Sequence, residues 1–335
     1  MNKSKKIKTV VTDYIEEDLN WEREQLRSSP SVTFDAYQLK HASEDQLVEK
    51  VHDADIIVVN MAQFNERVIN ALDNCQLIIR HGVGYDNVDV AALTRKGIIL
   101  INIPDYCVEE VAEQTVMLIF NCARKFIRQQ ESMARSVEKG QWDFDLVYPI
   151  YQVSDKTLGV IGCGRIGSTI FRMMKGFNMR YLICDPYLTE ARKRELGITT
   201  VSMNEVLSES DIITIHTPLN DETRHLISEA QLKLMKQTAF IINTARGGIL
   251  DEDAIVKACQ QGWIAGAALD VYEFREPPNK NSKLLAVENI TLTPHLAWYS
   301  VESEWKIRKK IIENIKLFIE GKTVINVINP EVLKN

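Results

Sequence analysis

The stretch that most constrains the fold is residues 157–169, TLGVIGCGRIGST. Residues 158–161 form a short apolar run, typical of a strand buried on both faces. Gly162, Gly164 and Gly167 then follow at G-x-G-x-x-G spacing, and a helical pattern begins behind them. In such a strand–turn–helix unit the first glycine permits a tight turn and the second lets the backbone approach a pyrophosphate. The third lets the helix pack closely on the strand.

An acidic residue completes this dinucleotide fingerprint. The apolar run 181–184 ends in Asp185, 23 positions after Gly162. An acid there can accept hydrogen bonds from the adenosine ribose and repels a 2′-phosphate, while the helix N-terminus attracts the phosphates. The pattern predicts a unit that binds NAD rather than NADP; the alternative is an ordinary βαβ turn without a ligand. The cofactor contacts predicted in this unit are Gly162, Gly164, Arg165, Ile166, Gly167 and Asp185.

Length and composition bound the class of protein. A chain of 335 residues with 45% hydrophobic and 26% charged residues indicates two ordinary globular domains. A net charge of −6, with no basic stripe, argues against a nucleic-acid partner. No apolar run approaches the roughly 18 residues of a membrane span. The six scattered cysteines have no metal-ligand spacing, and the N-terminus has no signal peptide, so we expect a metal-independent cytoplasmic protein with reduced, buried cysteines.

The order of strands and helices predicts α/β architecture throughout. Short β-branched strands alternate with helical patterns over the first hundred residues, which indicates a parallel sheet covered by helices. A break at Pro104-Asp105 is followed by a long helix whose apolar positions run to Phe126, and by an aromatic-rich irregular segment, 138–151, that could reach a partner subunit. A final helix over 301–320 ends at Gly321. The strands expected between these helices are 7–12, 32–37, 55–60, 76–80, 98–102, 198–201, 211–216, 239–244, 264–269 and 290–293.

Polar residues follow the strands of the second domain, where ligands of open α/β sheets bind. The sequence places the His216-Thr217-Pro218 and Thr244-Ala245-Arg246 segments, Asp270 with Glu276 nearby, and His295 at strand ends. Each alone has a structural explanation, but together they fit alcohol oxidation. A histidine can move the hydroxyl proton, a carboxylate can orient its ring, and a guanidinium can grip a substrate carboxylate. His295 is the best-placed base and His81 the second candidate, whereas His216, Thr217, Pro218, Thr244 and Ala245 are expected at the cofactor.

The turn over residues 80–87 is a further candidate, because Gly82 and Gly84 could expose backbone N–H groups to an anion. A plain glycine-permitted turn is the equally good alternative on spacing alone.

The chain resembles the D-isomer-specific 2-hydroxyacid dehydrogenase family over nearly its whole length. The resemblance rests on motifs that occur in the family's order. They are GVGYDNVD (82–89), GVIGCGRIG (159–167), HTPL (216–219), NTARGG (243–248), GAALDVYEFREPP (266–278) and TPHLAWYS (293–300).

The resemblance implies roles for particular residues. Arg246 would bind and polarise the substrate, Glu276 would partner the histidine, and His295 would be the acid/base. Val83 and Gly84 would offer backbone groups to the substrate carboxylate, Asp270 would hold the nicotinamide carboxamide, and Asp185 the ribose.

The resemblance also implies an architecture. Two Rossmann-like domains with parallel sheets, one flavodoxin-like and one NAD-binding, would flank an inter-domain cleft. The substrate-binding domain would comprise residues 1–104 plus 299–335 and the NAD-binding domain residues 105–298, in a homodimer joined through the latter.

Within the family, the Ala-Trp-Tyr-Ser that follows His295 looks like the C-terminal-binding-protein branch. There Trp298 would line the substrate pocket; packing at the domain interface is the alternative. The chain departs from the family pattern in that Glu276 follows Asp270 by six positions rather than five, so Glu273 remains an alternative partner for His295. Residues 61–64 lack the arginine with which phosphoglycerate-specific relatives hold phosphate, which disfavours phosphoglycerate as the substrate.

These observations predict an NAD-dependent enzyme that interconverts a small D-2-hydroxyacid and its 2-ketoacid. The rival hypothesis is an NAD(H)-sensing scaffold, like the eukaryotic corepressors of the same branch, with only vestigial turnover. The short stretch expected after the final helix leaves no long tail for partner motifs and favours the enzyme.

Overall fold

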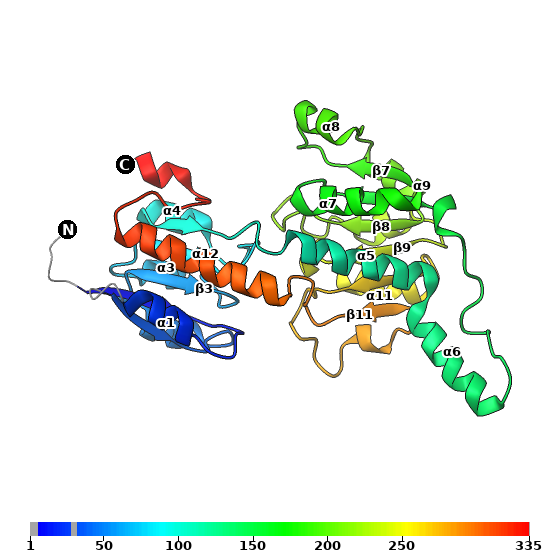
Figure 1. The fold of residues 1–335 in the computed structure, drawn as a ribbon, viewed down its shortest axis with the longest axis horizontal. Coiled ribbons are helices and arrows are strands. Elements are labelled where there is room, and N and C mark those ends of the chain that lie inside the picture. The colour runs from blue at the N-terminus through cyan, green and yellow to red at the C-terminus, as the bar shows by residue number, and fades with distance from the viewer. Residues whose placement is uncertain (1–5, 28–31, 335) are drawn as a thin grey trace. The chain divides into compact units, whose positions relative to one another are not determined.

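The computed structural model describes residues 6–27 and 32–334 and divides the chain into two compact units. Unit 1 comprises Met1–Tyr106 with Ser300–Asn335, and unit 2 comprises Cys107–Tyr299. Both are built on sheets of parallel strands (Figure 1). Among the described residues, no helix is long and apolar enough to cross a bilayer.

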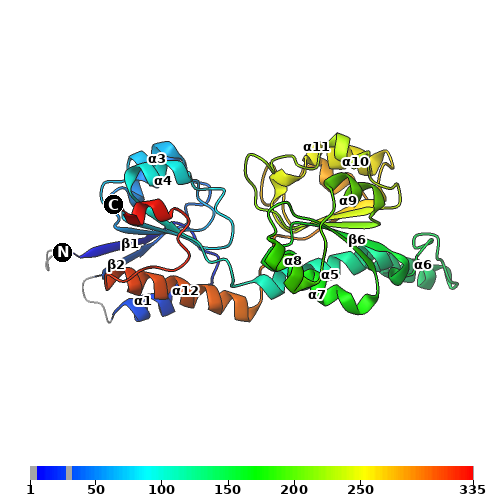
Figure 2. The same ribbon diagram turned by 90° about the horizontal axis from the view of Figure 1, so that it is seen from above.

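The sheet of unit 1 has the flavodoxin-like strand order β2-β1-β3-β4-β5. The central strands β3 and β4 are buried at every position, and Figure 2 shows α3 and α4 on one face of the sheet with α1 and α12 on the other. The strands are β1 (Ile7–Val11), β2 (Val32–Ala36), β3 (Ile56–Val59), β4 (Leu77–Arg80) and β5 (Ile99–Ile101). The helices are α1 (Asn20–Arg27), α2 (Glu44–Val51), α3 (Glu66–Asn70), α4 (Val90–Lys96) and α12 (Val301–Ile319), with a 3-10 turn η5 (Pro330–Lys334).

The sheet of unit 2 has the order β11-β10-β9-β8-β6-β7, with every pairing parallel. Helices α9, α10 and α11 cover one face, and α5 and α7 cover the other (Figure 2). The strands are β6 (Thr157–Ile161), β7 (Arg180–Cys184), β8 (Ile212–Ile215), β9 (Phe240–Asn243), β10 (Gly266–Leu269) and β11 (Ile290–Leu292). The helices are α5 (Val108–Arg124), α6 (Phe126–Lys139), α7 (Arg165–Met174), α8 (Glu190–Leu196), α9 (Met203–Glu209), α10 (Glu229–Leu232) and α11 (Glu252–Gln260); the 3-10 turns are η1 (Val153–Asp155), η2 (Lys175–Phe177), η3 (Gly247–Ile249) and η4 (Lys283–Ala286).

The strand order of unit 2 reverses between β6 and β8. From β6 the chain first adds β7 on one side, and it then adds β8, β9, β10 and β11 in turn on the other side. Ligands of doubly wound sheets bind beyond the carboxyl ends of the strands at such a switch point. The glycine turn after β6 and the His216 segment after β8 both lie there. The predicted α/β fold class with two parallel sheets, flavodoxin-like and Rossmann-type, is confirmed.

Two predicted elements are wrong. The strand expected over 198–201 is reduced to one bridge, between Thr200 and Ile183. The segment lies beside β7, the edge strand of the sheet, and pairs with it at that one position. The long helix does not run through Phe126: α5 ends at Arg124, and Lys125 adopts a left-handed conformation with φ of 55°. A second helix, α6, then starts at Phe126, which is solvent-exposed rather than on the buried face.

Candidate active site

The three glycines of the turn after β6 meet three different constraints. Gly162 has φ of +86°, and a Cβ there would lie 2.6 Å from the backbone oxygen of His216. A Cβ on Gly167 would lie 2.1 Å from the Gly162 oxygen, so only glycine lets α7 pack this closely. Around Gly164 nothing lies within 4 Å of the Cβ position, which leaves space for a ligand. The turn therefore has the steric form that a pyrophosphate needs.

The polar groups around this turn also fit a dinucleotide. The N–H groups of Arg165, Ile166 and Gly167, at the start of α7, donate to no acceptor among the described residues. The hydroxyl of Thr217 is buried and makes no hydrogen bond within the described part of the chain. The carboxylate of Asp185 accepts from the N–H of Cys163 at 2.8 Å and from Tyr187 at 3.0 Å, which fixes it beside the glycine turn.

The other residues expected at the cofactor lie at the ends of β8 and β9. His216 Nε2 lies 2.7 Å from the Thr214 hydroxyl, and burial lowers the pKa of His216 to about 3, so its ring is neutral. The hydroxyl of Thr244 lies 2.9 Å from that of Thr115 on α5. The Ala245 N–H donates to the Asn243 side chain at 3.0 Å. These contacts hold both segments rigidly at the sheet edge.

His295 and Glu276 form a hydrogen-bonded pair after β10 and β11. His295 Nδ1 lies 2.5 Å from Glu276 Oε2, and Glu276 Oε1 accepts from the Tyr272 N–H at 3.1 Å. Burial by itself raises the pKa of Glu276, but the hydrogen bond and charge of His295, the Tyr272 N–H and the charge of Arg246 outweigh it and lower that pKa. Glu276 is therefore an ionised carboxylate that fixes the ring through Nδ1, and this bond does not use Nε2 of His295.

Asp270 holds the turn that carries His295. Its carboxylate is fully buried and accepts from the Thr293 hydroxyl at 2.5 Å, the Leu296 N–H at 3.1 Å and the Ala297 N–H at 2.9 Å. The Tyr272 hydroxyl donates to the Thr293 carbonyl at 2.6 Å. Sequence reasoning missed Tyr272; its position two residues after Asp270 was the available signal.

Arg246 lies in the turn after β9. The Asn243 side chain donates to its carbonyl at 2.8 Å, and its own Nη1 donates to the Ala245 carbonyl at 2.8 Å. A Cβ on the neighbouring Gly247 would lie 2.0 Å from the backbone of Tyr272, so glycine lets this turn pack against the segment that leads to Glu276. The structure thus brings Arg246, Glu276 and His295 together within unit 2.

Glu273, the alternative partner of His295, is engaged elsewhere. Its Oε1 lies 2.5 Å from His225 Nε2, and its Oε2 accepts from the Glu252 N–H at 3.1 Å. Between Asp270 and Glu276 the chain forms a loop in which Phe274 is exposed to solvent. Glu276 makes the contact with His295 in this structure.

In unit 1, the turn after β4 carries Val83 and Gly84. Neither of their N–H groups donates a hydrogen bond to any described residue, and both residues are half-buried. The Asn102 side chain donates to the Val83 carbonyl at 2.6 Å and fixes the peptide plane. Trp298, in unit 2, is half-buried and stacks edge-on against Tyr299 with ring centroids 5.3 Å apart.

Comparison with known proteins agrees with this geometry. Residues 116–297 match the family model "D-isomer specific 2-hydroxyacid dehydrogenase, NAD binding domain". A glyoxylate reductase of Korarchaeum cryptofilum is 37% identical over 296 residues, covering 87% of this chain and 88% of that protein. A D-3-phosphoglycerate dehydrogenase of Methanocaldococcus jannaschii is 37% identical over 325 residues, covering 96% of this chain and 59% of that protein. The crystal structure of D-lactate dehydrogenase from Aquifex aeolicus with NAD and lactic acid superimposes with a TM-score of 0.85 at 31% identity, covering 96% and 99% of the two chains.

The chain is thus a Rossmann-type oxidoreductase that uses a nicotinamide cofactor. It belongs to the D-isomer-specific 2-hydroxyacid dehydrogenase family, and unit 2 carries that family's NAD-binding domain.

Proposed function

We propose that the protein is an NADH-dependent reductase that converts a 2-ketoacid to its D-2-hydroxyacid, with His295, Glu276 and Arg246 as the catalytic residues. The observation that carries the proposal is the hydrogen bond between His295 and the ionised Glu276. It lies at the strand ends of the sheet that carries the open glycine turn.

The chain's own residues supply the proton and the charge stabilisation. When bound, the nicotinamide supplies the hydride for C2 of the ketoacid. His295 donates a proton from Nε2 to the carbonyl oxygen as negative charge develops there, while Glu276 holds the ring in place. The Arg246 guanidinium binds the substrate carboxylate and polarises the carbonyl.

The N–H groups of Val83 and Gly84 would receive the substrate carboxylate. Among the described residues these two adjacent donors have no acceptor, and successive N–H groups of this kind can bind an anion. Asp270, with three hydrogen bonds to the turn that carries His295, would meet the nicotinamide carboxamide next to the catalytic histidine.

Asp185 would select NAD over NADP. Its carboxylate is already fixed by the Cys163 and Tyr187 N–H groups and retains capacity to accept from ribose hydroxyls. We expect Asp185→Ala to weaken NADH binding and to reduce discrimination against NADPH, as measured by the dissociation constants of both. Equal NADH affinity in the variant would remove this role from Asp185.

The substrate is proposed to be a small ketoacid without a phosphate. Curated relatives similar to this chain include both glyoxylate reductases and phosphoglycerate dehydrogenases. Residues 61–64 contain no cation, and the buried Asp13 carboxylate accepts from the N–H groups of Asn60, Met61 and Ala62, so this loop offers a phosphate no positive charge and these three donors are taken. Trp298 would line the side-chain pocket, as in the C-terminal-binding-protein branch; that branch assignment stays a prediction.

The experiment is NADH oxidation against a panel of 2-ketoacids, from glyoxylate and pyruvate to hydroxypyruvate and branched-chain, thioether and phenyl ketoacids. We expect fast turnover of at least one, and loss of turnover with intact NADH binding in His295→Ala. Slow turnover of all of them, with tight NADH binding, would instead support the NAD(H)-sensing scaffold. Association with a partner at saturating NADH that survives His295→Ala would do the same.

We also propose a homodimer in which α6 and the segment after it contact the second copy. In both views α6 extends beyond the layers of unit 2 (Figures 1 and 2). The large apolar side chains exposed there are Phe126, Ile127, Met133, Val137, Trp142, Phe144 and Tyr148. An exposed apolar patch of this kind marks an interaction surface.

A cytoplasmic location is proposed as well. All six cysteines are buried free thiols, as in proteins of a reducing compartment.

A further inference from the structure

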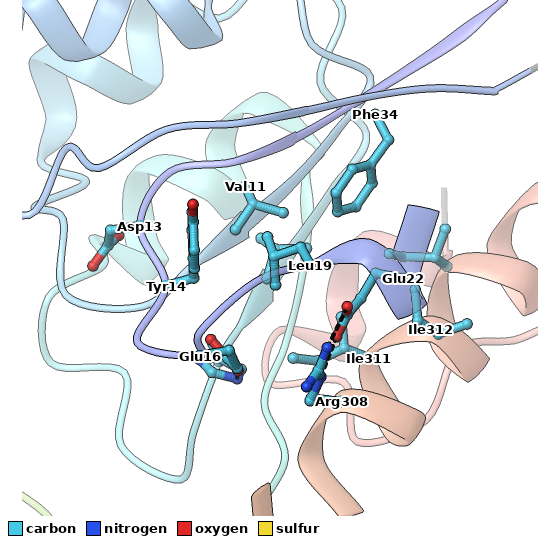
Figure 3. A pocket seen from close by; sticks show the side chains of 13 residues that line it. Val11, Asp13, Tyr14, Glu16, Leu19, Glu22, Phe34, Arg308, Ile311 and Ile312 are labelled. Carbon is cyan, nitrogen blue, oxygen red and sulfur yellow. Dashed lines mark hydrogen bonds and ion pairs between the residues drawn. The ribbon is translucent and has the colours of Figure 1, made fainter. Parts of the chain in front are cut away.

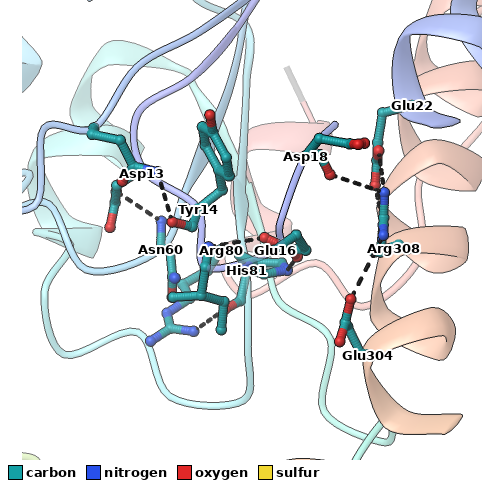
Figure 4. A network of polar contacts seen from close by, with 12 residues as sticks. Asp13, Tyr14, Glu16, Asp18, Glu22, Asn60, Arg80, His81, Glu304 and Arg308 are labelled. Carbon is teal, nitrogen blue, oxygen red and sulfur yellow. Dashed lines mark hydrogen bonds and ion pairs between the residues drawn. The ribbon is translucent and has the colours of Figure 1, made fainter. Parts of the chain in front are cut away.

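Unit 1 contains a buried ion pair that the proposed chemistry does not use. His81 Nε2 lies 3.1 Å from Glu16 Oε1, and the two side chains are 8% and 2% exposed. Figure 4 shows the pair at the centre of a polar network that also contains Asp13, Arg80 and Arg308. A buried carboxylate such as that of Glu16 is costly unless it is paired and hydrogen-bonded, so the contact is strongly specified.

The pair connects two loops at the carboxyl edge of the sheet. Glu16 lies in the loop after β1, where its Oε2 accepts from the Ile15 N–H at 2.9 Å. His81 follows β4 directly and immediately precedes the Gly82-Val83-Gly84 turn; its N–H donates to the Val59 carbonyl at 2.7 Å. The charge pair is thus one residue away from the turn whose free N–H groups would receive the substrate carboxylate.

Apolar side chains around the pair keep water away from it, so the attraction between the two side chains is poorly screened. The pair borders a cavity of about 20 Å³ whose apolar lining comes from β1, β2, β3, α12 and the loop before α1 (Figure 3). That volume suits one water molecule rather than a ketoacid, so the cavity is not a second substrate site. Its apolar lining residues are Val11, Leu19, Phe34, Val58, Ile311, Ile312 and Ile315.

A second buried pair lies on the same cavity. Arg308 on α12 donates from Nε to Glu22 on α1 at 2.5 Å and from Nη2 at 2.8 Å, and its Nη1 lies 3.6 Å from Glu304. Among the described residues, Arg308 makes no hydrogen bond or ion pair with the 81–84 turn, but its charge interacts with Glu16. Glu22 and Arg308 therefore offer an internal comparison of similar burial and charge.

We propose that the Glu16–His81 ion pair positions the Val83-Gly84 turn for the substrate carboxylate, which makes Glu16 and His81 positioning residues of the reductase. The inference rests on the proposed function. The pair anchors the turn at its start, while Asn102 anchors the Val83 carbonyl from β5. Loss of the first anchor leaves the N–H groups free to turn away from the anion, at little cost to the chemistry at His295.

The test compares Glu16→Gln and His81→Asn with the wild type in steady-state kinetics on the best 2-ketoacid of the panel. We expect the KM for the ketoacid to rise by about tenfold or more, because a small displacement of a substrate-binding group is costly. We expect kcat to change much less, and the dissociation constant of NADH to stay unchanged. The double variant is expected to show little further increase in KM, since both changes break one contact.

Glu22→Gln is the matched control, because it breaks the other buried pair of the same cavity and leaves the 81–84 turn alone. We expect it to lower the melting temperature with an unchanged KM. Hydrogen exchange of residues 82–87 should accelerate in Glu16→Gln and not in Glu22→Gln, and this reading stands even if one variant is too unstable for kinetics.

The outcomes separate the two claims. An active wild type with an unchanged KM and unchanged exchange in Glu16→Gln and His81→Asn would show that the pair only stabilises unit 1, and the positioning role would be lost. A wild type that reduces no 2-ketoacid would overturn the proposed function and the positioning role with it.

Discussion

At the scale of single residues, two neighbouring carboxylates of unit 2 pair with two different histidines. Glu273 and Glu276 both lie shortly after Asp270. The choice depends on loop geometry: Glu273 turns toward His225, and Glu276 is anchored by the Tyr272 N–H and turns toward His295. The sequence favours Glu276 as the partner of His295, but its one-residue difference in spacing from the family pattern leaves Glu273 as an alternative, because spacing alone does not show how the loop folds.

Glu276→Gln is the first prediction at this scale. The amide keeps the size of the side chain but loses the charge that orients and stabilises the protonated imidazole. We expect kcat for ketoacid reduction to fall by about 100-fold with NADH binding intact. Glu273→Gln is the control and should stay close to the wild type, as measured by the same assay. A larger loss in Glu273→Gln than in Glu276→Gln would reverse the assignment.

The second prediction concerns the stability of unit 1 in acid. Burial acts to raise the pKa of Glu16, but the hydrogen bond and charge of His81 and the backbone N–H groups prevail and lower it from 4.5 to about 2. A carboxyl whose pKa is depressed by folding stabilises the folded state above its unfolded pKa, and that contribution is lost as the pH falls. We expect it to be present above pH 4.5 and to disappear toward pH 2, with an upper bound on the order of 3 kcal/mol.

Denaturant unfolding of the wild type and Glu16→Gln at several pH values measures this contribution. The difference in the free energy of unfolding between them should shrink as the pH falls below 4.5. A difference that is constant across that window would mean that Glu16 titrates normally in the folded protein.

At the scale of elements, sequence patterns predicted those with strong local signals and missed those decided by neighbours. The β6–turn–α7 unit follows from three glycines, each with its own steric reason. The break between α5 and α6 does not follow from periodicity, because apolar residues continue through it. At the break, the Asn121 side chain accepts from the Ile127 N–H at 3.3 Å, and Lys125 takes up a left-handed conformation. The edge segment 198–201 has strand-like residues but only one bridge to β7.

The glycine turn gives a prediction that separates folding from binding. Gly167→Ala places a methyl group 2.1 Å from the Gly162 oxygen, so α7 must shift, and we expect a loss of about 1–3 kcal/mol in stability together with weaker NADH binding.

Gly164→Ala meets no protein atom within 4 Å, so the melting temperature should hold while the dissociation constant of NADH rises by about tenfold. Gly176→Ala, also in open space but outside the turn, is the control. Unchanged NADH affinity in Gly164→Ala would place the pyrophosphate elsewhere.

At the scale of the whole molecule, alternating strands and helices were enough to predict two parallel α/β sheets, because the repeat of buried strands is a long-range property of the sequence. The final helix α12 belongs to unit 1 although it follows unit 2 in the chain. Composition and periodicity do not reveal that return; the expectation of it came from the family resemblance. The contacts that secure it, such as the bidentate Arg308–Glu22 pair, join residues 286 positions apart, which no local pattern encodes.

The last prediction concerns the association of two chains through α6. Phe126, Met133 and Val137 recur at helical spacing on its exposed side, and Trp142 stacks on Phe144 just beyond its end. Exposed apolar side chains gathered in this way mark an interaction surface, whereas Ser132 and Ser136 on the adjacent side of the helix are buried against the chain near Asp143. Val137→Glu with Trp142→Ala should therefore convert a dimer to a monomer in sedimentation velocity while the fold of unit 2 and its NADH affinity persist.

Leu333→Glu, an equally polar change at an exposed leucine of unit 1, should leave the dimer intact. A double variant that sediments like the wild type would exclude α6 as the contact between copies, and a monomeric wild type would exclude the homodimer itself.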